Sequence, residues 1–149
     1  MKNILLLIFI VIPFFVLSQE KQKRLALIIG NSNYEKGILK NPVNDARLMA
    51  STLDSLNFDV LLKENLSTRR EMTDAIREFE SKLSEYDVSF VYYAGHGIQV
   101  DNQNYLLPTK EVFKNETDVL DYGINIQKIL RALTSKSNLV SILVLDACR

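Results

Sequence analysis

This 149-residue chain has a single cysteine, no net charge and neither of two common phosphate-binding motifs, and each of these absences excludes or disfavours a class of protein. A single cysteine excludes an internal disulfide and leaves the thiol free to react. The 18 basic and 18 acidic residues cancel, so we expect neither a nucleic-acid partner nor binding to an anionic membrane surface. Residues 30–34 (GNSNY) match neither the G-x-G-x-x-G nor the G-K-[ST] phosphate cradle, which disfavours a nucleotide-binding domain.

The N-terminal segment has the composition of a secretory signal peptide. Residues 4–17 are apolar, and Val16 and Ser18 place small side chains before a cleavage point. This run is shorter than the roughly 20 residues that span a bilayer, so cleavage is favoured over an uncleaved membrane anchor. We therefore predict a signal peptide at residues 1–18 and export of the chain to the periplasm or the medium.

The remaining residues, 19–149, alternate between strand and helix patterns. Strands are predicted at 24–29, 58–62, 88–93 and 140–145, and the last two are apolar enough to be buried parallel strands. A hairpin is predicted at 98–107, and residues 110–121 are expected to form a polar loop. The resulting order, β-α-β-α-β-hairpin-α-β, predicts one α/β domain with a mostly parallel sheet and helices on both faces.

Three helices are predicted from their caps and apolar spacing. Asn41 and Pro42 begin the first helix, and Thr68 begins the second, with Glu71 completing a capping box. The expected buried faces are Ala46, Met49, Leu53 and Leu56 in the first helix, Met72, Ile76, Phe79 and Leu83 in the second, and Ile126, Ile129, Leu130 and Leu133 in the third.

The only histidine and the only cysteine each follow one of the two most apolar strands. His96 lies between two glycines just after residues 88–93, and Cys148 follows residues 140–145. Because neighbouring parallel strands end on one crevice, the imidazole and the thiol are expected to meet there. The Cys148 thiolate would be the nucleophile and His96 the general base and acid, while the N–H groups of Gly97 and Cys148 would form an oxyanion hole.

Each of these residues also has a simpler interpretation. A single cysteine at a strand end can be an inert small hydrophobe, and a single histidine can be an ordinary hydrogen-bonded residue. Their shared position after two buried strands favours the dyad. A metal site is disfavoured because one histidine and one cysteine fall short of a zinc ligand set.

Four segments resemble, in order, the signature blocks of the caspase-like cysteine peptidases. They are residues 24–31 (RLALIIGN), 39–46 (LKNPVNDA), 92–97 (YYAGHG) and 146–149 (DACR). The similarity is greatest to the metacaspase and bacterial caspase-like branch. It implies a three-layer αβα fold, in which His96 and Cys148 match the catalytic pair and Gly97 matches the oxyanion glycine.

The resemblance also implies cleavage of peptide or protein substrates after Arg or Lys. Aspartates that match Asp45 and Asp146 line the basic-residue pocket of this branch. Two carboxylates would bind a cationic side chain and reject an acidic one. The alternatives are a first-turn acid that complements the helix dipole for Asp45 and a turn-stabilising residue for Asp146.

Many metacaspases need calcium, held by an acidic cluster between the two catalytic residues. Glu116, Asp118 and Asp121 are the candidates here, and the adjacent aspartate pair of that site is missing from the sequence. We therefore expect a solvated acidic loop and no cofactor, with calcium binding as the alternative.

The caspase fold normally continues past the nucleophile with further strands and helices. Residues 19–149 are therefore expected to form the large-subunit portion of the catalytic domain, with its C-terminal strands missing and an unpaired edge on its last strand. A fragment, a fold completed by a small-subunit-like second chain, and an inactive truncated copy remain open. The first functional hypothesis is a cysteine endopeptidase, and the alternative is an inactive interaction module.

Overall fold

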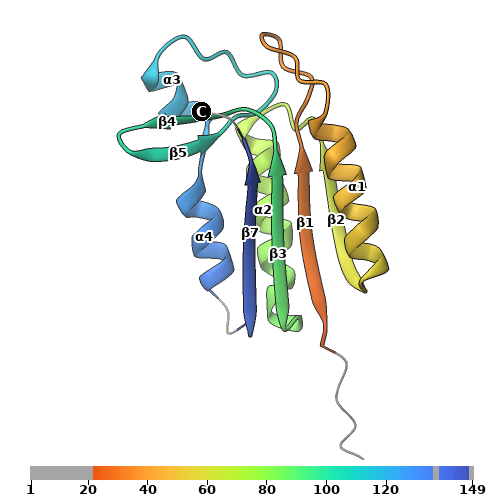
Figure 1. The fold of residues 1–149 in the computed structure, drawn as a ribbon. Helices are drawn as coiled ribbons and strands as arrows, with labels where there is room; N and C mark the ends of the chain where they lie inside the picture. The colour runs from red at the N-terminus through yellow and green to blue at the C-terminus, as the bar shows by residue number, and fades with distance from the viewer. Residues whose placement is uncertain (1–21, 136–137, 148–149) are drawn as a thin grey trace, which may run out of the picture.

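Four parallel strands form the centre of the structure, a computed structural model that describes residues 22–135 and 138–147 (Figure 1). The predicted signal peptide and Cys148 lie outside these residues. The strands are β1 (Arg24–Gly30), β2 (Phe58–Glu64), β3 (Val88–Ala94) and β7 (Val140–Asp146), in the order β2-β1-β3-β7. This arrangement confirms the predicted α/β class.

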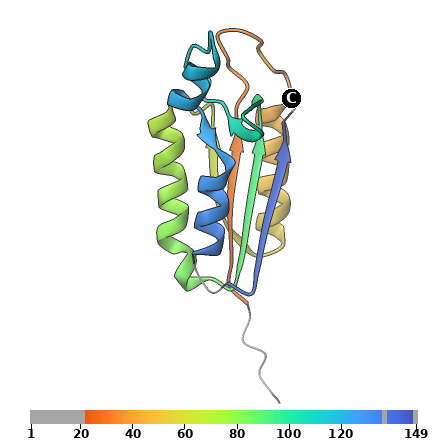
Figure 2. The same cartoon turned by 90° about the vertical axis from the view of Figure 1, so that its left-hand side faces the viewer.

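Helices cover both faces of this sheet, so the domain has three layers (Figure 2). α1 (Pro42–Ser55) packs on one face, while α2 (Arg69–Lys82) and α4 (Ile126–Thr134) pack on the other. β1 is buried by both layers: Leu25, Leu27 and Ile29 face α2 and α4, whereas Ala26 and Ile28 face α1. No helix in the described part of the chain is long and apolar enough to cross a membrane.

The second helix follows its prediction closely. The Thr68 hydroxyl accepts a hydrogen bond from the Glu71 N–H at 3.2 Å, and the predicted apolar stripe is fully buried. The Glu71 carboxylate accepts from the N–H of Ser67 at 2.6 Å, one residue before the cap. The short 3-10 helix η1 (Leu83–Glu85) continues α2.

The first helix differs from its prediction at both ends. Among the described residues, the Asn41 side chain makes no capping hydrogen bond. Leu56, expected on the buried face, is 51% exposed because it lies beyond the last helical turn. The buried face is formed by Pro42, Ala46, Ala50 and Leu53.

A small antiparallel sheet follows β3. β4 (Gly97–Val100) and β5 (Gln103–Leu106) form the predicted hairpin, which turns at Asp101 and Asn102 with positive φ angles of 49° and 60°. Two central residues with positive φ are typical of a type I′ turn. β6 (Ile124–Asn125) pairs with β5.

The expected polar loop at 110–121 contains a helix, α3 (Glu116–Tyr122). Asn115 and Asp118 form a capping box: the Asn115 side chain accepts from the Asp118 N–H, and the Asp118 carboxylate accepts from the Asn115 N–H. The helix was missed in the sequence because seven residues are too few to show a helical period.

β7 is not the buried strand that its sequence predicts. Val140, Ile142 and Val144 are 48%, 39% and 36% exposed, and only Leu143 is half-buried. Within the described residues, β7 pairs with β3 and with no other strand. The run is apolar like that of β3, and its burial is lower because one edge and one face have no neighbour in this part of the chain.

Candidate active site

The candidate site lies at the carboxyl end of the parallel sheet, where β3 and β7 end side by side (Figure 1). Ala94 is paired with Asp146, and the Gly95 N–H donates to the Asp146 carbonyl at 3.2 Å. His96 stands two residues beyond Ala94, as Cys148 stands two residues beyond Asp146. Because Ala94 and Asp146 are paired, the segments that lead to His96 and Cys148 leave the sheet from neighbouring positions.

The imidazole of His96 is fixed by the loop between β1 and α1. Its Nε2 atom lies 2.6 Å from the carbonyl oxygen of Gly37. A carbonyl oxygen can only accept a hydrogen bond, so Nε2 carries a proton, and in the neutral ring Nδ1 is the basic nitrogen. Gly37 has a φ of +75°, and a Cβ there would lie 3.0 Å from Nε2, so glycine suits this close approach.

Two tyrosines hold the backbone of His96. The His96 N–H donates to the Tyr34 hydroxyl at 2.8 Å, and the Tyr93 hydroxyl donates to the His96 carbonyl at 2.8 Å. The Tyr34 ring also contacts the imidazole, with 4.3 Å between ring centroids. A Cβ on Gly95 would lie 2.6 Å from the Tyr34 hydroxyl and 2.7 Å from that of Tyr93, so this network requires glycine before the histidine.

Burial keeps both tyrosines in their neutral form. Burial raises the pKa of Tyr34, and it raises the pKa of Tyr93 well above its ordinary value. Protonated hydroxyls remain able to donate to carbonyl oxygens. Sequence reasoning missed Tyr34, Tyr93 and Gly37 because their role depends on contacts between distant parts of the chain.

Three predicted site residues, Asp45, His96 and Asp146, line one cavity of about 310 Å³. We call it the acidic cavity; its remaining lining residues are Leu39, Lys40, Asn41, Pro42 and Gly95. Asp45 comes from the first turn of α1 and Asp146 from the end of β7. Asp45 and Asp146 are 101 positions apart in the sequence, and the fold brings both to one cavity beside the imidazole.

The two carboxylates act on a common neighbour, Tyr92. The Tyr92 hydroxyl donates to Asp146 Oδ2 at 3.3 Å. Burial, together with the negative charges of Asp146 and Asp45, raises the pKa of Tyr92 to about 12. Among the described residues, none of the ion pairs involves Asp45 or Asp146, so both carboxylates are available to a cation.

Comparison with known proteins identifies the family at this point. The family model of the caspase domain matches residues 23–149. The chain belongs to the caspase family. This confirms the resemblance to the caspase family seen in the four sequence blocks.

Two curated relatives contain a similar segment. The chain is 31% identical over 129 residues to mucosa-associated lymphoid tissue lymphoma translocation protein 1 of Homo sapiens, and 30% identical to its homolog of Mus musculus. The match covers 85% of this chain and 15% of each relative, so the caspase domain corresponds to a small part of those proteins.

A solved structure shares the fold. The crystal structure of a Geobacter sulfurreducens protein superimposes with a TM-score of 0.65 at 22% identity. The match covers 85% of this chain and 50% of that one. At this identity the likeness concerns the fold alone.

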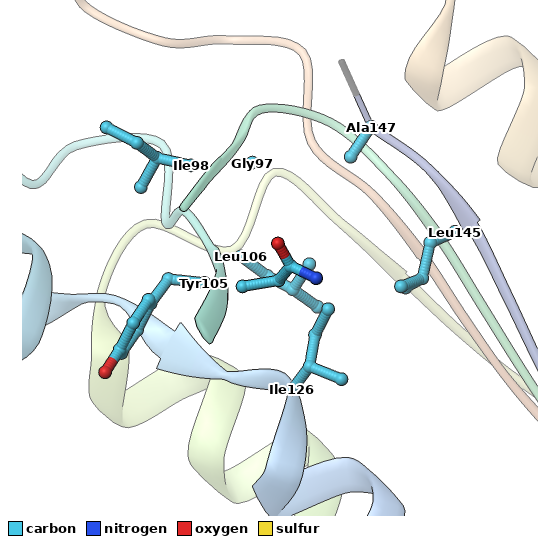
Figure 3. Close-up of a pocket in the computed structure, with 8 residues that line it drawn as sticks. Gly97, Ile98, Tyr105, Leu106, Ile126, Leu145 and Ala147 are labelled. Atoms are coloured by element: carbon cyan, nitrogen blue, oxygen red, sulfur yellow. The ribbon is translucent and has the colours of Figure 1, made fainter. Parts of the chain in front are cut away.

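A second cavity of the caspase domain, of about 170 Å³, opens beside Gly97 on the α4 side of the sheet (Figure 3). Its lining is mostly apolar: Ile98, Asn104, Tyr105 and Leu106 of the hairpin, Ile126 of α4, and Leu145 and Ala147 at the end of β7. Because consecutive residues of a strand point to opposite faces, Leu145 faces this cavity and Asp146 faces the acidic one. Gly97 therefore borders a separate opening from the one lined by His96.

One of the acidic residues considered as a calcium ligand, Asp118, has a structural role. The Asp118 carboxylate accepts from the N–H groups of Lys114 at 2.7 Å and Asn115 at 3.2 Å, which caps α3. Within the described residues, no group of three or more His, Cys, Asp or Glu side chains is arranged to hold a metal ion.

Proposed function

We propose that this caspase domain is a cysteine endopeptidase that uses a Cys148–His96 dyad and cleaves after Arg or Lys. The main supporting observation is the hydrogen bond between His96 Nε2 and the Gly37 carbonyl. It leaves Nδ1 as the basic nitrogen at the end of β3, next to the strand that leads to Cys148. A base held in one tautomer beside a thiol is the arrangement that activates a nucleophile.

In the proposed reaction, His96 Nδ1 takes the proton of the Cys148 thiol, and the thiolate attacks the carbonyl carbon of the scissile bond. The N–H groups of Gly97 and Cys148 stabilise the resulting oxyanion. The imidazolium then protonates the leaving amine as the C–N bond breaks, which forms a thioester. Water, deprotonated by His96, hydrolyses the thioester and restores the thiol.

The acidic cavity supports the proposed specificity. Asp45 and Asp146 supply two carboxylates beside His96, and a guanidinium or ammonium group would form charge-assisted hydrogen bonds with them. The exposed Lys40 also lines the cavity, and its positive charge would repel a cationic side chain and so reduce the attraction of the two carboxylates. An acidic side chain would face two like charges and is expected to be rejected.

Labelling with peptidyl electrophiles tests the proposal directly. Two probes that differ only in Arg or Asp next to the reactive group are incubated with the purified chain, and the intact mass is measured. We expect a single label on Cys148 with the Arg probe, and its loss in Asp146→Asn. Equal labelling by the two probes would contradict the basic specificity, and labelling that survives His96→Ala at full rate would contradict the dyad.

The exposed edge of β7 supports a second part of the proposal. Val140, Ile142 and Val144 lie exposed on a strand that pairs on one side within the described residues. Such an edge can accept a further strand through its free backbone groups. We propose that a small-subunit-like segment or chain pairs there and extends the substrate site beyond the residues that hold the dyad. If Cys148 of the purified chain reacts with simple alkylating agents and not with the Arg probe, the domain alone is an interaction module, which is the alternative function.

Export is a further proposal from the N-terminal composition. If residues 1–18 are removed as predicted, mass spectrometry of the exported protein will show a chain that begins at Gln19. An intact Met1 in a membrane fraction would indicate an uncleaved anchor.

A further inference from the structure

We propose that this caspase domain binds an apolar side chain of the residue that follows the cleaved bond. The site is a cavity of about 180 Å³ that shares His96, and no other lining residue, with the acidic cavity. We call it the leaving-side cavity, and its aromatic and aliphatic lining residues are Tyr34, Leu107, Val112 and Phe113. The inference rests on the proposed peptidase function and extends it to the second half of the substrate.

The leaving-side and acidic cavities both border the hydrogen bond between His96 and Gly37. The segment Tyr34–Lys36 lines the leaving-side cavity, and Leu39–Pro42 lines the acidic one. Gly37, whose carbonyl accepts from His96, lies between these segments in the sequence. His96 lines both cavities. A substrate that crosses the imidazole therefore has one cavity available on each side of the bond to be cleaved.

The proposed chemistry assigns a direction to these cavities. The basic side chain before the bond enters the cavity of Asp45 and Asp146. His96 gives its proton to the amine that leaves, and this amine belongs to the residue after the bond. That residue must lie against the imidazole when the bond breaks, so its side chain meets the leaving-side cavity.

The walls of this cavity select an apolar side chain. Tyr34 is buried beneath it and held by its contacts with His96, and Phe113 packs against the cluster of Val100, Tyr105 and Val119. These contacts make a fixed apolar base, while Val112 stays accessible at 43% exposure. Burial of an apolar side chain against such walls removes its surface from water and is favourable.

Size and charge narrow the ligand further. Engineered apolar cavities of about 150 Å³ bind benzene, so a cavity of this size accepts a leucine or phenylalanine side chain. The charged lining residues are Glu35, Lys36 and Glu111, with one more carboxylate than ammonium group. An acidic side chain after the cleaved bond is therefore disfavoured.

Four quenched peptides that differ only in the residue after Arg test the inference. This residue is Leu, Phe, Ser or Asp, and kcat/KM is measured for each with the full chain. We expect Leu and Phe to exceed Ser by about tenfold, as a hydrophobic pocket discriminates by small apolar groups, and Asp to be the poorest. Equal rates for Leu and Ser would overturn the inference and leave the proposed peptidase function standing.

A matched pair of variants locates the effect. Val112 and Leu120 are 43% and 42% exposed, but Leu120 lies outside the leaving-side cavity. Val112→Ser is expected to reduce the preference for Leu over Ser to about twofold, whereas Leu120→Ser keeps it. Reaction with the Arg electrophile shows that the dyad still forms in both. A preference that survives Val112→Ser would overturn the inference, and no cleavage together with no labelling of Cys148 would overturn the proposed function with it.

Discussion

The ends of β3 and β7 carry the two halves of the proposed dyad, and the fold supports them differently. β3 lies between two strands, its residues 91–94 are buried, and Gly37, Tyr34 and Tyr93 fix His96 just beyond it. β7 has one neighbouring strand in the described part of the chain and exposes most of its side chains. The core of this domain therefore positions His96, the proposed base, by itself, whereas the strand that leads to Cys148, the proposed nucleophile, has a single neighbouring strand among the described residues.

The largest expected effect concerns the nucleophile. Cys148→Ala should abolish peptidase activity, because the chain has no other cysteine to attack the carbonyl. Hydrolysis of an Arg peptide by the purified variant is the measurement, with the parent chain as control. Cleavage that persists in the variant would place the nucleophile elsewhere and would show that β7 does not carry it.

The next effect concerns the base. His96→Ala should lower kcat by about 10²- to 10⁴-fold, the range typical of a positioned general acid–base group. The free energy of unfolding should change little, since His96 is half-buried at the surface. Kinetics and circular dichroism together check this. An unchanged kcat in a folded variant would show that His96 and the contacts that hold it support the fold and take no part in catalysis.

Tyr34→Phe tests whether the network around His96 positions it. The variant keeps the ring and removes the acceptor of the His96 N–H, which leaves a partly buried donor unpaired. We expect a stability loss of about 1–3 kcal/mol. A fall in kcat of about tenfold to a hundredfold is also expected, because small displacements of a catalytic group are costly.

The control is Tyr122→Phe at the end of α3, where the side chain is 42% exposed. Its stability and kcat should match those of the parent. If Tyr34→Phe loses stability but keeps its kcat, then the tyrosine supports the fold and does not position the base.

The smallest effect measures the difference between the strands themselves. Val91 of β3 is 0% exposed and Val144 of β7 is 36% exposed. Val91→Ala should cost about 2 kcal/mol, from two lost buried methyl groups and the cavity they leave. Val144→Ala should stay within about 0.5 kcal/mol in the isolated chain. Denaturant unfolding of both variants checks this, and similar costs would show that β7 is buried in solution by a further contact.

The sequence predicted the elements whose pattern is local. The second helix has its cap residue at Thr68 and an apolar stripe at helical spacing, and both are present in the structure. The hairpin was predicted at 98–107 and is present at 97–106; its turn, expected over the polar residues 101–104, is confined to Asp101 and Asn102. The family was also readable from four short blocks in the right order.

The errors concern neighbours that a local pattern cannot show. Residues 140–145 have the apolar composition of a buried strand, but burial depends on what packs against the strand. Leu56 has the right spacing for the buried face of α1 and falls past the last turn. α3 is too short to show a helical period, so its residues were expected to form a loop.

The candidate site divides in the same way. The residue types of the proposed dyad and of the acidic cavity, His96, Cys148, Asp45 and Asp146, were selected from the sequence by their places in the motifs. Tertiary structure decided which of the described ones meet: it brought Asp45 and Asp146 to the same side of His96 and set the imidazole tautomer through the Gly37 carbonyl. A hydrogen bond between a loop and a strand end 59 residues apart has no local signature, because the chain must fold before the two atoms are neighbours.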